Sequence, residues 1–387
     1  MPQIAGFRGI LPAAGKVSDV VASPALLADP AALAAGTVAR DPGRAVYRYH
    51  QVFQMGGRSV TRKALVAAIR LAPWADRQIR AHEVADPKAR EAELARITAT
   101  HVHVEPVLCG FRDAAGEVDH QFRGVDGGRP THEHITADGT VHRLYRSTSA
   151  EILGPLRKAF APKKLHVLEG HGRYEAMLAY SEALATKSPL SLDSAGNYAL
   201  ACLVNLDDTT VYNATCARHR IVRGDGITAA SVLAAAKQLF IIEKLPAAAA
   251  DEARLRAALA ETVAHQPAFA IAFAGEPDAY KLTLSPDVSL VNEGVAVNRA
   301  LQKLDPIVIE SFFVPRCLAG ATLTPELDLP AAFAAEADAV IATRPVPLDQ
   351  ILYAGELGQL MPEHATAFVP GLANLVSFSI DPDEDLV

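Results

Sequence analysis

Apolar and polar residues alternate from Ala45 to Gln54, and this period of two predicts a half-buried β-strand. The pair Gly56-Gly57 follows at once and is typical of a tight hairpin turn. Residues 64–69 are apolar throughout and predict a buried strand after the turn. The first part of the chain is therefore expected to contain a β-hairpin.

A second pattern begins at residue 165, in the middle of the chain. Residues 165–168 form a short apolar run that predicts a strand. Tyr174, Met177 and Leu178 then recur at helical spacing, so a helix with one core-facing side is expected after a short turn.

The turn between this strand and helix carries the densest chemistry of the chain. Gly170 and Gly172 let the backbone bend sharply and approach a ligand closely. The first N–H groups of a helix have no partner inside the helix and favour an anion. Arg173 adds a forked cation suited to phosphate or carboxylate. The alternative is an ordinary strand–turn–helix junction with Arg173 paired to a surface carboxylate.

Other segments complete a mixed pattern of helices and strands. The polar stretch 113–140 predicts hairpin loops or a lid. Helices are expected at 87–97, 150–160 (with Ser149 as its N-cap), 229–245 and 247–262, and strands at 100–111, 141–146, 197–206, 211–216 and 307–313. The mixture predicts an α+β or mixed α/β fold.

Length and composition set broader limits. The 387 residues allow two or three domains at roughly 100–200 residues each. We place the regions at 1–160, 161–245 and 246–387. The chain is 50% hydrophobic and 21% charged, which permits a large core, and its net charge of −7 argues against a nucleic-acid partner.

The cellular compartment follows from three features of the sequence. Four widely spaced cysteines without a CxxC motif read as free thiols in a reducing compartment. The start of the chain lacks the pattern of a signal peptide. No uncharged apolar run of about 18 residues predicts a membrane span. We therefore expect a cytoplasmic protein that does not enter a membrane.

Several polar pairs invite functional readings. His82-Glu83 combines a carboxylate base with an imidazole, or is a solvated pair at a helix start. His219-Arg220 ends an expected strand and lines a cleft or lies on the surface. The pairs at 101/103 and 132/134 suit zinc or iron, but no HExxH or CxxC accompanies them, so we expect solvated histidines and no resident metal.

Six stretches, in order, resemble one bacterial and archaeal family, known as domain of unknown function 1015. The resemblance spans about residues 4–378. Its stretches are residues 6–12, residues 47–58, Ile79 to Glu83 with Pro87-Lys88, residues 165–174, His219-Arg220, and residues 355–370. The family's central motif is in turn similar to the phosphate box of the ParB-like group, which includes enzymes that phosphorylate free serine.

The resemblance implies a ParB-like phosphate-binding core with an additional sheet and helices. It implies phosphoryl transfer to free serine or a related hydroxyl metabolite, with Mg²⁺ and a nucleotide or pyrophosphate, a phosphate-containing small molecule being the partner. Glu83 would be the base, next to His82. The implied phosphate- or ligand-binding residues are Glu169, Gly170, His171, Gly172, Arg173, His219, Arg220 and His364.

The chain departs from the family pattern at six places. The Thr after His82-Glu83 is missing, and the spacing to Pro87-Lys88 is shortened. Glu169 replaces Asp and Gly172 replaces the second His of the central motif, while His364-Ala365 and Gly371 replace cationic or hydroxyl residues near the end. Two functions therefore stay open. One is a phosphotransferase, and the other is a catalytically degenerate regulatory or interaction protein that binds a nucleotide or metabolite without turnover.

Overall fold

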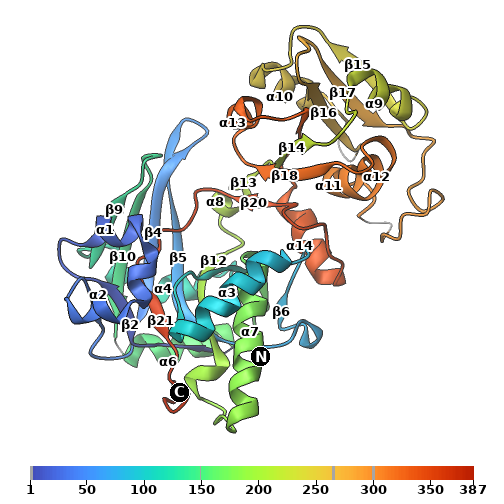
Figure 1. The fold of residues 1–387 in the computed structure, drawn as a ribbon. Helices are drawn as coiled ribbons and strands as arrows, with labels where there is room; N and C mark the ends of the chain where they lie inside the picture. The colour runs from blue at the N-terminus through green and yellow to red at the C-terminus, as the bar shows by residue number, and fades with distance from the viewer. Residues whose placement is uncertain (1–2, 149, 264–265, 299–300) are drawn as a thin grey trace. The chain divides into compact units, whose positions relative to one another are not determined.

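The computed structural model describes residues 3–148, 150–263, 266–298 and 301–387, which divide into two compact units (Figure 1). The first unit holds the described residues up to Ala214 together with Phe368–Val387, and the second runs from Thr215 to Ala367. The regions expected from sequence divided the chain differently, at 160/161 and 245/246. The strand from Leu165 to Glu169 pairs within the first unit, and the end of the chain returns to the same unit.

Both units mix helices and strands, so the fold is of the mixed α+β class, as predicted. No helix in the described part of the chain is long and apolar enough to cross a membrane. Cys109 and Cys202 are buried free thiols, as expected.

One large sheet organises the first unit. Its strands lie in the order β6 (Ile79–Arg80), β11 (Leu165–Glu169), β8 (Val107–Phe111), β12 (Tyr198–Asn205), β5 (Arg58–Arg70), β4 (Val46–Met55), β10 (Val141–Ser147) and β9 (His132–Ile135), and β1 (Ile4–Ala5) also pairs with β5. A smaller sheet has the order β3 (Val38–Arg40), β2 (Gly9–Pro12), β21 (Ser377–Ser379) and β7 (Val102–His103).

The predicted hairpin is confirmed as β4 and β5. The two strands pair antiparallel, with Met55 opposite Arg58 across the glycine turn. Gly56 and Gly57 have φ values of 57° and 74°, the left-handed conformation that a tight two-residue hairpin requires.

Helices surround the large sheet of the first unit. They are α1 (Val17–Ala22), α2 (Pro30–Ala34), α3 (Pro87–Thr100), α4 (Glu117–Gln121), α5 (Arg123–Asp126), α6 (Ala150–Phe160), α7 (His171–Lys187) and α8 (Thr209–Tyr212), with 3₁₀ turns at Pro24–Ala28, Trp74–Asp76 and Ala195–Asn197. Asp86 caps α3 by accepting from the backbone of Lys88. Helices α3 and α7 lie side by side (Figure 1). The helix expected at 150–160 is α6, and its expected cap, Ser149, lies outside the described residues.

The second unit is built on an antiparallel sheet. Its order is β15 (Phe240–Leu245), β17 (Ala279–Leu284), β16 (Ala268–Phe273), β19 (Ala339–Ala342), β14 (His219–Arg223) and β18 (Thr322–Glu326). Its helices are α9 (Ala229–Ala236), α10 (Glu252–Ala260), α11 (Asp305–Val308), α12 (Val314–Cys317), α13 (Leu329–Ala334) and α14 (Leu348–Leu357), with a π-helical turn at Ile309–Phe313. Strands β13 (Thr215–Cys216) and β20 (Ala367–Phe368) lie where the chain passes between the units.

Alternation along β16 places different side chains on the two faces of this sheet. Ala268 and Ala270 pack in a core cluster with Leu255 of α10 and Leu329 of α13. Phe269 points the other way, and its ring lies 4.7 Å from that of Phe313 in the π-helical turn. The sheet is therefore covered on both faces.

Three predictions of secondary structure are wrong. The strand expected at 211–216 is present only as β13 at its end, and its first two residues belong to α8, because Asp208 accepts from Thr210 N and starts a helix. The strand expected at 307–313 is α11 and the π-helical turn, since periodicity cannot separate a mostly buried helix from a strand. The helix expected at 229–245 ends as α9 at Ala236, and β15 follows because its residues pair with β17.

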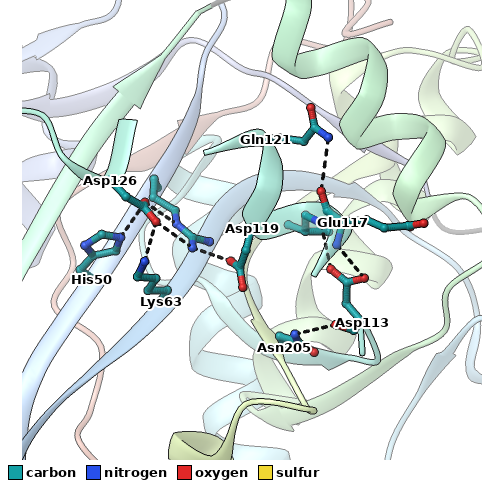
Figure 2. A network of polar contacts seen from close by, with 10 residues as sticks. His50, Lys63, Asp113, Glu117, Asp119, Gln121, Asp126 and Asn205 are labelled. Carbon is teal, nitrogen blue, oxygen red and sulfur yellow. Dashed lines mark hydrogen bonds and ion pairs between the residues drawn. The ribbon is translucent and has the colours of Figure 1, made fainter. Parts of the chain in front are cut away.

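The polar segment 113–140, expected to be loops or a lid, contains α4, α5 and β9, and a network of charges fixes α5 to the hairpin (Figure 2). The buried Arg48 donates to Asp126 Oδ1 at 3.0 Å, as His50 Nε2 does at the same distance. Lys63 Nζ donates to Asp126 Oδ2 at 2.7 Å, and Arg48 also donates to Asp119. Burial raises the pKa of Asp126, but these hydrogen bonds and the Arg48 charge outweigh it and hold the pKa well below the usual range.

Candidate functional site

Three titratable side chains meet at one edge of the large sheet. His82 and Glu83 follow β6, and His171 is the first residue of α7, which follows β11. Strands β6 and β11 pair in parallel, so the residues after both strands leave at the same edge. This pairing brings together two sequence elements that are far apart in the chain.

The carboxylate of Glu83 lies beside both imidazoles. Its Oε1 is 3.4 Å from His171 Nδ1, and its Oε2 is 3.8 Å from His82 Nε2. The two rings meet edge to face, with centroids 4.6 Å apart. Both imidazole side chains are only 2% exposed, while that of Glu83 is 12% exposed. Glu83 is therefore the member of the group that solvent or a ligand can reach.

Hydrogen bonds to the backbone assign the tautomers of the two histidines. His82 Nδ1 lies 2.9 Å from the carbonyl oxygen of Val167, which can only accept, so Nδ1 carries the proton and Nε2 is an acceptor. His171 Nε2 lies 3.5 Å from the N–H of His82, which can only donate, so the proton of His171 is on Nδ1. This Nδ1 lies 3.4 Å from Glu83 Oε1 but makes no hydrogen bond among the residues described. Glu83 thus lies between an N–H group and a ring nitrogen that carries a lone pair.

Burial keeps His82 neutral. Desolvation, helped by the neighbouring His171, lowers the pKa of His82 to about 3, although Glu83 and the Val167 carbonyl act in the opposite direction. At neutral pH its Nε2 therefore carries a lone pair, 3.8 Å from Glu83 Oε2. This lone pair can accept a hydrogen bond from a protonated Glu83 carboxyl that moves closer, while the low pKa of His82 keeps the proton on Glu83.

The turn before α7 has a backbone that fits an anion. Gly170 adopts φ 90°, a left-handed conformation, and no side chain of the described residues caps the helix. A Cβ at Gly170 would lie 2.8 Å from Arg173 Nε, so the guanidinium lies directly over the turn. Arg173 Nη1 donates to Glu105, and its buried Nε has no hydrogen-bond partner among the residues described.

Two residues that replace the family pattern have packing or backbone roles here. Glu169 Oε1 accepts from the backbone N–H of Phe368 at 2.9 Å. A Cβ at Gly172 would lie 3.3 Å from both Asp86 O and Arg90 N. The side chain that the family places at 172 would therefore press on the start of α3, and Gly172 allows α7 to approach α3 closely.

The remaining predicted ligand residues belong to the second unit, and their contacts are described within that unit. His219 is buried, and its Nδ1 accepts from Thr343 N at 3.1 Å; burial, with a smaller effect of Arg256, lowers its pKa to about 4. Arg220 Nε donates to Glu310 Oε1 at 2.9 Å. Arg220 Nη2 also donates to the His364 carbonyl at 2.9 Å.

Glu310 is a member of this second cluster that the sequence pattern does not reveal. It lies in the π-helical turn, within a run that reads as an apolar strand. Burial raises its pKa, although Arg220 acts in the opposite direction. The only available signal is a carboxylate inside an apolar stretch.

Of the histidines expected to be solvated, His101 is exposed, His132 and His134 are half-buried, and His103 is buried. His101 Nδ1 lies 2.5 Å from Tyr180 Oη, and His132 Nε2 lies 2.8 Å from Pro12 O. His103 is 1% exposed and packs against Phe378. Within the described ranges, no group of three or more His, Cys, Asp or Glu side chains is placed to hold a metal ion.

Comparison with known proteins gives one family and several distant structures. The model of the family described as "Protein of unknown function (DUF1015)" matches residues 30–306. No curated protein matches the chain.

Three solved structures are similar at low identity. A free serine kinase in complex with AMP is 13% identical, with a TM-score of 0.39, over 79% of this chain and 89% of that one. SbnI from Staphylococcus aureus with a C-terminal truncation is 12% identical, with a TM-score of 0.39, over 83% and 90%. A conserved hypothetical protein from Pyrococcus furiosus is 12% identical, with a TM-score of 0.36, over 77% and 90%.

Proposed function

This chain belongs to the family described as "Protein of unknown function (DUF1015)", and from that premise we propose that its first unit transfers a phosphoryl group to a small hydroxyl metabolite. The observation that carries the proposal is Glu83, a partly exposed carboxylate with an N–H donor, His171, on one side and a neutral acceptor, His82, on the other. Free serine is the acceptor we would test first, because the stretch 165–174 resembles a phosphate box found in enzymes that phosphorylate it.

The reaction needs a base, which is Glu83, and groups that bind the phosphate, which are the start of α7 and Arg173. The hydroxyl proton of the acceptor moves to Glu83 while its oxygen forms a bond to phosphorus. The bond from phosphorus to the bridging oxygen of the donor breaks, and the electron pair leaves with the donor. The Nδ1–H of His171, 3.4 Å away, would orient the carboxylate, and His82 Nε2, 3.8 Å away, would accept a hydrogen bond from the carboxyl once it is protonated.

The start of α7 would neutralise the phosphate charge. Its first N–H groups and the Arg173 guanidinium lie around Gly170. Arg173 is bonded to Glu105, so a phosphate would compete with that carboxylate for one end of the guanidinium. We expect Mg²⁺ to enter with the nucleotide or pyrophosphate as part of the substrate.

A second candidate is a regulatory protein that binds the same ligand without turnover. The observation in its favour is that Glu169 bonds to the Phe368 backbone and Gly172 packs against α3. Both differ from the family pattern.

The two candidates are separated by a product assay. The protein is incubated with L-serine, Mg²⁺ and ATP, ADP or pyrophosphate, and phosphoserine is measured by mass spectrometry. We expect product with at least one donor. Absence of product with every donor, while a thermal shift still reports nucleotide binding, would leave the regulatory candidate.

Phosphate binding by Arg173 can be tested separately. Arg173→Gln should weaken binding of the phosphate donor by about ten- to a hundredfold, the value of one charge-assisted hydrogen bond. Arg129→Gln removes an exposed cation elsewhere in the unit and is the matched control. Equal affinities for the two variants would remove Arg173 from the site. The contribution of His219, Arg220 and His364 to ligand binding stays a prediction.

A further inference from the structure

We propose that the second unit contains a separate binding site for a small organic carboxylate with an apolar body. The site lies at the end of the sheet where β16 begins and β17 and β19 end. These strands are antiparallel neighbours, with Ala268 opposite Thr283 and Ala270 opposite Ala342, so the loops at this end converge. The inference does not depend on the function proposed for the first unit.

Two adjoining cavities form the site. The larger has a volume of about 480 Å³, and Leu284, Val288 and Leu290 provide apolar walls. The smaller, of about 210 Å³, lies between the start of α11 and the start of α14. Lys303 lines both cavities, which places it at their boundary. The larger volume lies within the range of roughly 300–1,000 Å³ that small-molecule sites occupy.

The charges of the site favour an anion. Lys303 is the one charged residue among the described residues that line the larger cavity. In the smaller cavity, Arg344 donates to both oxygens of Asp305, at 2.7 and 2.8 Å, and this pair cancels. Among the described residues that line the two cavities, the surplus is one positive charge on Lys303, in a chain whose net charge is −7. An ammonium group at an apolar wall is a partner for a carboxylate.

The polar neighbours of Lys303 supply further donors. Gln266, Ser285 and Gln302 line the larger cavity, and each side chain carries an N–H or O–H group, although Gln302 Nε2 also donates to Val297 O at 3.5 Å. A carboxylate has two oxygens and accepts several hydrogen bonds. The apolar walls would contact the rest of the carboxylate ligand. An inorganic anion has no apolar part to make these contacts.

Four prolines restrict the backbone of the walls. Pro267 and Pro286 line the larger cavity, and Pro345 and Pro347 line the smaller. Proline fixes φ and has no N–H, so these segments lose little freedom when a ligand binds and offer an apolar surface without unsatisfied donors. A preformed wall of this kind reduces the entropic cost of binding.

The probe for the test is 4-phenylbutyrate, which combines a carboxylate with an apolar body. Its neutral analogue 4-phenylbutanamide and inorganic phosphate are the matched probes. The full chain is titrated by isothermal calorimetry. We expect 4-phenylbutyrate to bind with a dissociation constant of about 1 mM or tighter, as typical ligand efficiencies allow. The amide and phosphate should bind at least about tenfold more weakly.

Variants locate the binding. Lys303→Gln should weaken 4-phenylbutyrate about tenfold, the loss of one charge-assisted bond, and Val288→Asp should abolish binding by adding a like charge to the apolar wall. Lys237→Gln removes an exposed lysine of the same unit outside both cavities and should change nothing. Arg173→Gln in the first unit should also leave the affinity unchanged.

Each contrary outcome overturns the inference. No heat with 4-phenylbutyrate would remove the site. If the amide bound as tightly as 4-phenylbutyrate, the charge of the ligand would play no part in recognition. If phosphate bound more tightly than 4-phenylbutyrate, the site would not select a ligand with an apolar body. Loss of binding in Arg173→Gln but not in Lys303→Gln would assign the ligand to the first unit. Thermal melting of each variant confirms that it is folded.

Discussion

Two carboxylates of the first unit, Asp126 and Glu83, lie in opposite kinds of surroundings. Asp126 accepts from Arg48, His50 and Lys63 at 2.7–3.0 Å, and its pKa is held well below the usual range (Figure 2). Glu83 lies beside two imidazoles, at 3.4 and 3.8 Å, and one of these is kept neutral by burial.

From this difference we expect one carboxylate to be structural and the other to be available for chemistry. A carboxylate surrounded by cations is strongly stabilised as an anion, so it holds elements together and does not accept a proton near neutral pH. A carboxylate beside a neutral imidazole has a second acceptor for any proton it takes up. We infer that Asp126 fixes α5 to the hairpin and that Glu83 is available for chemistry.

The largest expected effect is on turnover in Glu83→Gln. Removing a general base costs about 10²–10⁴-fold in rate, which is roughly 3–5 kcal/mol of activation free energy. The free energy of unfolding should change little, because glutamine keeps the shape of the side chain. Phosphoserine production and urea unfolding measure the two quantities. Glu91→Gln on the exposed side of α3 is the control and should retain full turnover.

The opposite pattern is expected for Asp126→Asn. The change removes the charge opposite the buried Arg48, whose side chain is 2% exposed. The free energy of unfolding should fall by about 2–3 kcal/mol, less than for a fully orphaned buried charge because Asp119 still accepts from Arg48. Turnover per folded molecule should persist. A variant as stable as the wild type in urea would show that the network is not structural.

The Asp126 network and the buried histidines should affect the free energy of unfolding in different ranges of acid pH. The folded-state pKa of Asp126 is lowered, so its stabilisation is present above the unfolded pKa of about 3.9 and is lost as the pH falls below it. His82 and His103, whose pKa values burial lowers to about 3, make the protein lose stability earlier, as the pH falls below about 6.5.

Urea midpoints measured between neutral and acid pH test this order. In Asp126→Asn, the steep loss below about pH 4 should flatten, while the loss between about pH 6.5 and 4 should remain. If the urea midpoint of this variant fell below about pH 4 as steeply as that of the wild type, Asp126 would not be the source of the stability that is lost there.

The smallest effect concerns a buried histidine that belongs to neither site. Both ring nitrogens of His103 are buried without a hydrogen-bond partner among the residues described. His103→Leu should therefore raise the free energy of unfolding by about 1 kcal/mol and reduce the loss of stability below about pH 6.5. The exposed His120→Leu is the control and should leave the thermal midpoint unchanged. A destabilised His103→Leu would imply a polar role for this ring.

Local patterns in the sequence predict the elements that depend on local interactions. The hairpin of β4 and β5 follows from alternation and two glycines, and α7 follows from helical spacing after Gly170. The run 307–313 is misread as a strand because five of its seven residues are buried, which weakens the periodicity that identifies a helix.

Long-range contacts in both sites lie beyond the sequence pattern. Asp126 accepts from Arg48 and Lys63, but it lies in a segment whose sequence is merely polar. No local pattern therefore predicts the network. Glu83 and His171 meet because two short strands pair in parallel, and a two-residue strand such as β6 leaves no recognisable period. The resemblance to a family suggested both as site residues, while their distance required the structure.

The most direct measurement is the rate of phosphoserine formation by the wild-type chain and by Glu83→Gln, at equal concentrations of folded protein. The reaction contains L-serine, Mg²⁺ and each phosphate donor in turn. The account predicts phosphoserine with the wild type and at least about a hundredfold less with the variant, as loss of a general base requires. Equal rates for the two proteins would contradict it.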